Sequence, residues 1–420
     1  MKVYIETYGC AANKSDTEIM LGLLASSGFE IAKSPEDADV LIINTCIVKT
    51  PTANRMVWRI KSLKKYNKPL IIAGCMAKAE QKFLEKIAPE ASLLGPNSVG
   101  KVVEVVKNTL QGKRVVEVDF ISEKPKLPHI RLNPIISIVQ ISTGCLLKCT
   151  YCETKLARGD LKSFEPKSIL NRIRIDLLEG VKEIWLTSQD NGCYGFDIGT
   201  DLPSLLEKIV EFKENFFIRV GMMNPVWVKR ILSRLLDVYQ SNKIFKFFHI
   251  PLQSGSDKVL SHMKRGYTAE DFIREVEEIR KKFPLANIST DIIVGYPTET
   301  YNDFKKTVEV IQLTRPDIIN ISKFSSRPGT EAHKLKQLPP SEIKKRSVEL
   351  HKLKLKISAE NNKKWHGWEG DVLIDEKNNL GRNIYYKPIV AKSNKNLFGK
   401  IVKVKVIETR SNFLLGKLIE

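Results

Sequence analysis

The sequence predicts an α/β protein built from a parallel-sheet α/β domain over residues 1–125, a partial (β/α)6 barrel over residues 130–360, and a small β-barrel over residues 361–420. Three observations lead to this fold class. A chain of 420 residues is long enough for two or three domains. Apolar strand-like runs alternate with amphipathic helical segments, which is typical of parallel sheets. Beyond the last long helix, only short strands separated by turn residues follow.

Composition narrows the classes of protein and partner. No apolar run approaches the length of a membrane span, and the first residues form a strand pattern without a signal peptide, so we expect no membrane association and a cytoplasmic protein. Seven cysteines, an odd number, favour metal or catalytic use over a disulfide framework. The net charge of +20 favours a polyanionic partner, nucleic acid first, although a basic surface that only aids solubility is the alternative.

In the first domain, three predicted strands are each followed by a cysteine. Strands over 3–8, 40–45 and 69–74 lead to Cys10, Cys46 and Cys75, with helices predicted over 13–28 and 52–66. Parallel strands end on one edge of a sheet, so the three thiols should converge there. They suit an iron–sulfur cluster with an open site; three separate packing cysteines are the alternative. Ser15 and Glu18 fit a capping box at the helix start, and residues 112–130 are predicted to be a basic linker.

A second set of three cysteines follows an apolar run over 134–141. Cys145, Cys149 and Cys152 have C-x3-C-x2-C spacing in a segment led by Gly144. A closed [4Fe–4S] cluster takes four ligands, so three thiolates leave one iron open. Structural zinc is the alternative, but it takes four ligands and no further cysteine or histidine lies close by.

The middle of the chain continues with further strand and helix pairs. With the run at 134–141, the strands are expected over 183–187, 216–220, 245–250, 289–294 and 317–322, and the helices over 166–179, 203–213, 225–240, 269–283 and 302–314. Chemistry in such barrels lies at the strand C-terminal ends, where polar side chains gather. Cys193 follows one such end and is expected to be a packing cysteine. A lysine-rich helix over 341–364 either has a solvated face or follows a phosphate backbone.

The last sixty residues form a basic β module. Residues 361–420 hold 12 Lys and Arg against 6 Asp and Glu, a net charge of +6. Residues 402–406 alternate valine and lysine, which places positive charge on one face of a strand. With Tyr385 and Tyr386 expected to be exposed, the module can contact phosphates and stack on bases. A barrel that only stabilises the chain is the alternative.

The C-x3-C-x2-C motif with Tyr151 before its last cysteine resembles the signature of radical S-adenosylmethionine (SAM) enzymes. The resemblance implies that Cys145, Cys149 and Cys152 hold a catalytic [4Fe–4S] cluster whose open iron chelates SAM, and that cleavage of SAM yields a 5′-deoxyadenosyl radical. We expect the cofactor to be bound by polar residues at the strand ends and by an arginine suited to its carboxylate. The candidates are Tyr151, Gln189, Asp190, Gln253, Ser254 and Arg265.

The remaining motifs resemble the methylthiotransferases within that superfamily. The matching segments are residues 7–16, 44–46, 74–76, 154–159, 249–256, 263–267 and 291–297, and the C-terminal module resembles the RNA-binding TRAM domain. The resemblance implies a second, auxiliary [4Fe–4S] cluster on Cys10, Cys46 and Cys75, and makes Asn13, Asn44 and Arg158 candidate substrate residues, although the two asparagines also suit turns and caps. Glu153 departs from the family, whose members usually carry an apolar residue there; it either alters the cluster potential or faces water.

Residues 154–159, 194–199 and 381–388 look most like the threonylcarbamoyladenosine tRNA methylthiotransferases of archaea and eukaryotes. That resemblance implies methylthiolation at C2 of the modified adenosine beside the tRNA anticodon, with the anticodon stem-loop, an unidentified electron donor and a sulfur source as partners. Three alternatives stay open: the same chemistry on isopentenyladenosine, methylthiolation of an aspartate in a ribosomal protein, and a non-catalytic iron–sulfur protein that binds RNA.

Overall fold

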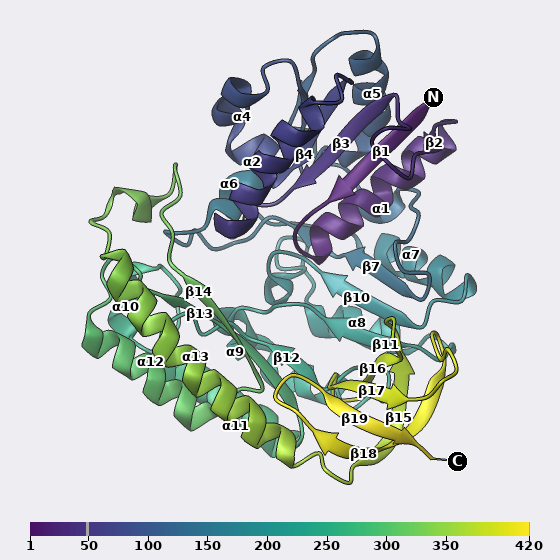
Figure 1. The fold of residues 1–420 in the computed structure, drawn as a ribbon. Coiled ribbons are helices and arrows are strands. Elements are labelled where there is room, and N and C mark those ends of the chain that lie inside the picture. The colour runs from purple at the N-terminus through teal and green to yellow at the C-terminus, as the bar shows by residue number, and fades with distance from the viewer. Residues whose placement is uncertain (48–49, 420) are drawn as a thin grey trace.

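The computed structural model describes residues 1–47 and 50–419, apart from the side chains of residues 50 and 51. Its elements form three sheet systems in the order that the sequence predicts: a parallel sheet, a partly closed parallel barrel and a closed antiparallel-rich barrel (Figure 1). Every helix in the described part of the chain is too short or too polar to cross a bilayer.

The N-terminal part is a six-stranded parallel sheet with strand order β2-β1-β3-β4-β5-β6. Its elements are β1 Lys2–Thr7, α1 Ala11–Ser26, β2 Glu30–Ile31, β3 Val40–Thr45, α2 Thr50–Lys64, β4 Leu70–Gly74, α3 Cys75–Ala79, α4 Gln81–Ile87, β5 Ser92–Leu94, α5 Val102–Leu110 and β6 Val116–Glu117. Because β1 has β2 on one side and β3 on the other, the strand order reverses at β1, and open α/β sheets bind ligands beside such a reversal.

Two local expectations for this part are wrong. Helix α1 begins at Ala11, so Ser15 lies inside it, and the Ser15 hydroxyl donates 3.0 Å to the carbonyl of Ile138 instead of capping the helix. Residues 112–130 are not a free linker, since Val116–Glu117 extend the sheet and Lys124 is buried. In both cases a contact with a distant part of the chain replaces the local one.

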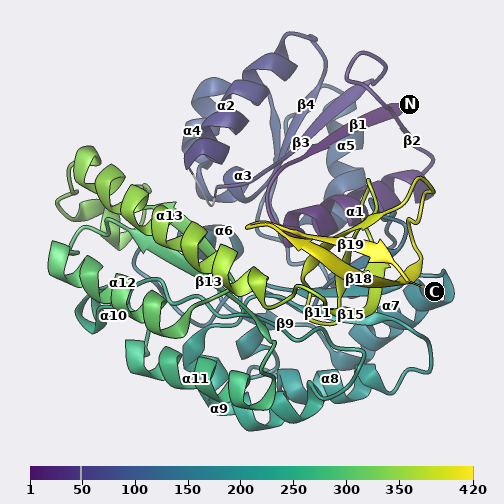
Figure 2. The same cartoon turned by 60° about the horizontal axis from the view of Figure 1, so that its bottom comes forward.

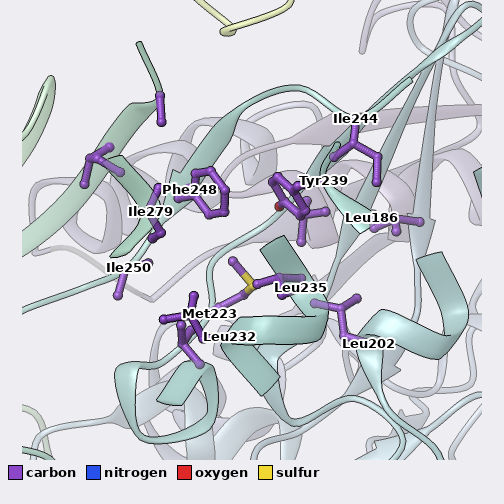
Figure 3. Close-up of a cluster of buried hydrophobic side chains, with 14 of the residues drawn as sticks. Leu186, Leu202, Met223, Leu232, Leu235, Tyr239, Ile244, Phe248, Ile250 and Ile279 are labelled. Carbon is purple, nitrogen blue, oxygen red and sulfur yellow. The ribbon is translucent and has the colours of Figure 1, made fainter. Parts of the chain in front are cut away.

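The middle part is a set of six parallel strands that forms an open barrel. Its strands are β7 Ile136–Gln140, β10 Glu183–Thr187, β11 Phe217–Val220, β12 Phe247–His249, β13 Asn287–Val294 and β14 Ile318–Lys323. Its helices are α6 Glu153–Arg158, α7 Pro166–Leu178, α8 Leu202–Val210, α9 Pro225–Val238, α10 Asp257–His262, α11 Ala269–Lys282, α12 Tyr301–Thr314 and α13 Pro340–Lys363. Two short strands, β8 Ser142–Thr143 and β9 Lys162–Ser163, pair with each other. A bridge from Ile218 to Ile244 joins the β7-β10-β11 half to the β12-β13-β14 half. Leucine, isoleucine and aromatic side chains fill the space between strands and helices (Figure 3).

Two buried ion pairs fix elements of the middle part. Asp176 on α7 is fully buried and accepts hydrogen bonds from His129, Ser137 and Arg172. Arg346 on α13 donates 2.7 Å to the Glu299 carboxylate, and both are buried. The Arg346 pair explains how a lysine-rich helix is held along the barrel, beside α12 in Figures 1 and 2.

The C-terminal part is a closed five-stranded barrel with strand order β15-β16-β17-β19-β18. Its strands are β15 Glu369–Ile374, β16 Leu380–Asn383, β17 Pro388–Lys392, β18 Ile401–Thr409 and β19 Leu414–Leu418. The expected exposure of Tyr385 and Tyr386 is wrong. The chain turns at Tyr386, which has φ +57°. The centroid of the Tyr386 ring lies 4.9 Å from that of Phe245 in the middle part, and the centroid of the Tyr385 ring lies 5.3 Å from that of Trp365. Tyr386 therefore docks the barrel onto the middle part, whereas Tyr385 packs against the barrel's own core, and neither is a base-stacking surface.

An ion pair completes this docking. The Lys387 ammonium donates 2.8 Å to the Asp317 carboxylate at the start of β14, and both side chains are buried. Side chains alternate along strand β18 of the barrel: Lys403 and Lys405 are exposed, while Val404 and Val406 are buried. The alternation predicted for residues 402–406 is therefore confirmed, and one face of β18 is basic.

Candidate active site

The three N-terminal cysteines lie at the ends of three neighbouring strands. Cys10 follows β1 and precedes α1, Cys46 follows β3, and Cys75 begins α3 directly after β4. Since β1, β3 and β4 are adjacent in the sheet, the thiols converge at the edge where the strand order reverses. Burial, together with the neighbouring Cys10 and Cys46, raises the pKa of Cys75 to about 11. The site is therefore a set of close thiols, which would release protons on binding a metal cluster.

Two glycines leave room for the strand ends that carry these cysteines to lie close together. Gly9 has φ +111°, and a Cβ built on it would lie 2.8 Å from Cys46 Cβ. Gly74 has φ +88°, and its Cβ would lie 2.3 Å from Asn44 Oδ1. Side chains at either position would push the strand ends apart, which gives a physical reason for glycine immediately before Cys10 and Cys75.

Asn13, Asn44 and Arg158 lie behind these thiols and are buried. The Asn13 amide donates to the carbonyls of Tyr8 (2.9 Å) and Thr45 (2.8 Å), and its Oδ1 lies 4.0 Å from Cys10 Sγ and 3.8 Å from Cys75 Sγ. The Asn44 amide donates 2.8 Å to the Asn13 carbonyl. Arg158, from α6, donates 3.0 Å to Asn13 Oδ1. The three residues thus support the strand ends from within.

The second cysteine set lies on the loop between the β7–β8 edge and α6. Gly144 opens the loop with φ +72°, and its N–H donates 2.7 Å to Gln189 Oε1 beyond β10. The Cys152 N–H donates 3.0 Å to the Cys149 carbonyl, which closes a tight turn. Burial, together with nearby Asp190, raises the pKa of Cys145 to about 12.

The seventh cysteine lies below this loop. Cys193 is fully buried, and its thiol donates 3.4 Å to the Asp190 carbonyl. Burial raises the pKa of Cys193, and Asp190 and Cys145 raise it further, so this side chain packs beside the loop as a neutral thiol.

The candidate cofactor residues surround the same loop, and several keep a buried polar atom without a hydrogen bond. Arg265 donates 3.3 Å to Cys149 Sγ, while its second terminal nitrogen has no partner. Asp190 accepts from the N–H groups of Gly192 and Asn224 through one oxygen only. Gln253 (φ +62°) leaves its Oε1 unpaired. Orphaned donors and acceptors around one loop fit a polar ligand such as SAM.

Ser254 and Tyr151 are placed differently. Ser254 is fully buried and faces Thr307 of α12 at 3.4 Å, so it supports the Gln253 loop from behind. Tyr151 packs edge-on against Tyr296, with ring centroids 6.5 Å apart, and lines a cavity.

That cavity, of 720 Å³, lies at the C-terminal ends of the barrel strands. Cys152 of the radical-type motif and Ile47, which directly follows Cys46, both line it, so it contacts the second cysteine set and extends to the residue next to the first. Its charged lining residues are Glu153, Asp291, Lys323 and Arg327. Glu153 is buried 3.4 Å from Arg327, which makes the water-facing alternative for this residue wrong. Burial raises the pKa of Glu153 to about 8, and Glu80 of the N-terminal part contributes.

Sequence reasoning did not select Lys323 and Arg327. They lie at and just beyond the end of β14, in the strand-end position that selected Gln189 and Gln253, but without a neighbouring motif to mark them.

No three His, Cys, Asp or Glu side chains among residues 1–47 and 50–419 already stand in a metal-binding arrangement. The assignment of clusters therefore rests on the cysteine spacing and the strand-end placement.

Family models match all three parts of the chain. They are the Uncharacterized protein family UPF0004 over residues 2–95, the radical SAM superfamily over residues 139–311 and the TRAM domain over residues 364–419. Among solved structures, the radical SAM methyltransferase TsrM from Kitasatospora setae matches with a TM-score of 0.58 at 13% identity, over 79% of this chain and 75% of TsrM. At that identity the likeness concerns the fold alone.

Full-length relatives give the family. A probable threonylcarbamoyladenosine tRNA methylthiotransferase of Pyrococcus horikoshii is 41% identical, with 100% of each chain covered. One from Archaeoglobus fulgidus is 42% identical over 100% of this chain and 99% of its own. The threonylcarbamoyladenosine tRNA methylthiotransferase of Danio rerio is 37% identical over 100% of this chain and 78% of its own. The chain therefore belongs to the threonylcarbamoyladenosine tRNA methylthiotransferase family within the radical SAM superfamily.

Proposed function

We propose that the protein adds a methylthio group at C2 of N6-threonylcarbamoyladenosine, next to the anticodon of tRNA. The observation that carries this proposal is a cavity that is lined by Cys152, by Ile47 next to Cys46, and by two cations, Lys323 and Arg327. A modified base in this cavity is within reach of chemistry at both sites, and its threonyl carboxylate finds a cationic partner.

Membership in the radical SAM superfamily implies a [4Fe–4S] cluster and SAM. We place this cluster on Cys145, Cys149 and Cys152, and SAM against Arg265, Asp190, Gln189 and Gln253. The unpaired polar atoms of Arg265, Asp190 and Gln253 support this arrangement. When bound, the cofactor supplies the radical that removes hydrogen from a carbon atom. The Arg265 guanidinium, fixed by Tyr267 and Cys149, is suited to hold a carboxylate.

We place a second [4Fe–4S] cluster on Cys10, Cys46 and Cys75. Three thiols at adjacent strand ends support it, since Cys10 and Cys46 are close enough to add to the burial that raises the pKa of Cys75. The room that Gly9 and Gly74 leave supports it too. Three thiolates leave an open iron for the sulfur that is transferred. We assign Asn13, Asn44 and Arg158 to support of this site rather than to substrate contact, because all three are buried behind the thiols.

Substrate chemistry separates this function from its rivals. An isopentenyl group is apolar and gains nothing from Lys323 and Arg327, whereas a threonylcarbamoyl group carries a carboxylate. The basic face of β18 and the lysine-rich α13 support RNA over a protein substrate. We take the anticodon stem-loop as the RNA element bound, with an electron donor and a sulfur source as further partners.

Mass spectrometry of tRNA nucleosides from cells with and without the protein tests the proposal. We expect the 2-methylthio derivative of threonylcarbamoyladenosine to disappear without the protein and to return with the wild type, but not with Cys145→Ala. A response of methylthio-isopentenyladenosine instead would assign the rival tRNA substrate. No change in any tRNA nucleoside would overturn the tRNA function in favour of a protein substrate.

A further inference from the structure

A buried group of charges connects the two cysteine sets. Helix α6 begins directly after Cys152 and ends at Arg158, and Figure 1 shows it beside the helices of the N-terminal part. It packs against α3, which begins with Cys75, and Ala157 belongs to the same apolar cluster as Cys75 and Met76. One short helix of the barrel part therefore reaches from the radical-type motif to the auxiliary site.

The charges at the end of α6 do not balance. Arg158 (2% exposed) donates 2.7 Å to Asp16 Oδ2, and Lys124 (1% exposed) donates 2.5 Å to Asp16 Oδ1. Gln140 accepts 3.1 Å from Lys124 and donates 2.8 Å to Asp16. Among the described residues, Asp16 is the carboxylate that forms ion pairs with these two cations. With Arg158 and Lys124 both protonated, the group carries one excess positive charge away from water, which is costly unless an anion lies close by.

The auxiliary site lies beside this group and would carry negative charge once its thiols bind a cluster. Arg158 donates to Asn13 Oδ1, and that oxygen lies within 4.0 Å of Cys10 Sγ and 3.8 Å of Cys75 Sγ. Burial lowers the pKa of Arg158, but Asp16, Cys75 and Cys10 together hold this pKa above its usual value. Three thiolates on a resting [4Fe–4S] core carry a net charge of about −1, which matches the excess.

We infer that Arg158, Asp16 and Lys124 form the buried counter-charge of the auxiliary cluster, with Arg158 as the positioning residue that ties α6 to it. The inference rests on the second cluster of the proposed function. Its consequence is a higher reduction potential for the auxiliary cluster than its thiolates alone would give, because nearby positive charge favours the reduced, more negative state.

The test uses the full-length chain with Cys145, Cys149 and Cys152 changed to alanine, reconstituted without oxygen so that any remaining cluster is auxiliary. Iron and sulfide contents are measured, followed by a redox titration monitored by electron paramagnetic resonance. We expect Arg158→Met to lower the midpoint potential and Arg158→Lys to stay close to the parent. The double variant Arg158→Met with Asp16→Asn keeps one excess positive charge on Lys124, so its potential should return toward that of the parent.

The outcomes separate the two ideas. If the triple-alanine parent protein binds no cluster, the proposed second cluster is refuted, and the inference is refuted with it. If the cluster forms and Arg158→Met leaves its potential unchanged, or the double variant fails to restore it, the counter-charge is refuted while the second cluster stands. Should Arg158→Met fail to fold, Lys124→Met removes the same charge and must lower the potential; an unchanged potential refutes the inference. A purely structural role would change cluster content without this dependence on charge.

Discussion

Lys323 offers the sharpest test of how the cavity selects its substrate. It lies at the end of β14 and lines the cavity, and among the described residues it forms no ion pair. Arg327, the other lining cation, lies 3.4 Å from the Glu153 carboxylate. If the threonyl carboxylate binds in this cavity, we expect Lys323, which has no carboxylate neighbour of this kind in the described part of the chain, to pair with it. Lys323→Met keeps the length and apolar stem of the side chain and removes only the charge.

The expected magnitude follows from the exposure of this lysine. A hydrogen bond to a charged group contributes about 1.5–3 kcal/mol. Because the Lys323 side chain is exposed, solvent screening places its contribution at the low end, about 1.5 kcal/mol. That corresponds to a roughly tenfold loss in kcat/KM. The loss should fall mainly on KM, because the threonyl carboxylate is remote from the reacting carbon.

The assay compares two anticodon stem-loop RNAs that differ only in the threonylcarbamoyl group, with methylthiolation followed by mass spectrometry and affinity by titration. We expect Lys323→Met to weaken binding of the modified RNA about tenfold and to leave the unmodified RNA unchanged. Lys208→Met, an exposed lysine on α8, serves as the matched control for loss of one positive charge. Equal weakening for both RNAs would mean that Lys323 contacts phosphate, and no weakening for either would refute the carboxylate site.

Three further predictions concern the framework. Arg346→Met leaves the buried Glu299 without its partner 2.7 Å away and should cost about 3 kcal/mol in the free energy of unfolding, whereas replacing both residues with methionine should recover most of it in thermal melts. Lys387→Met breaks the buried pair with Asp317 and should make the C-terminal barrel more sensitive to limited proteolysis, with little effect if the barrel docks through aromatic contacts alone. Although burial raises it, hydrogen bonds and nearby cations hold the pKa of Asp176 well below its usual range, so its contribution to stability is present above about pH 4 and is lost as the pH falls further. Asp176→Asn should therefore flatten the acid side of the stability profile in chemical denaturation, and an unchanged slope would contradict the assignment.

The sequence alone determined the order of elements and the location of both cysteine sets. Apolar periodicity is local, so β3, β10 and β13 were found close to their observed bounds. Parallel strands share one edge, so Cys10, Cys46 and Cys75 were expected to meet although far apart in the chain.

Only the tertiary structure decided which polar residues share a site. Asp16, Lys124, Gln140 and Arg158 meet through hydrogen bonds between residues as much as 142 positions apart, and no local pattern encodes such a distance. Tyr386 is a stacking candidate by composition, yet the barrel docks through it because the Asn383 side chain accepts from the N–H groups of Tyr385 and Lys387 and turns the strand. Local sequence propensity determines where helices and strands form. Whether a charged or aromatic side chain is buried depends on which surfaces of the fold pack together.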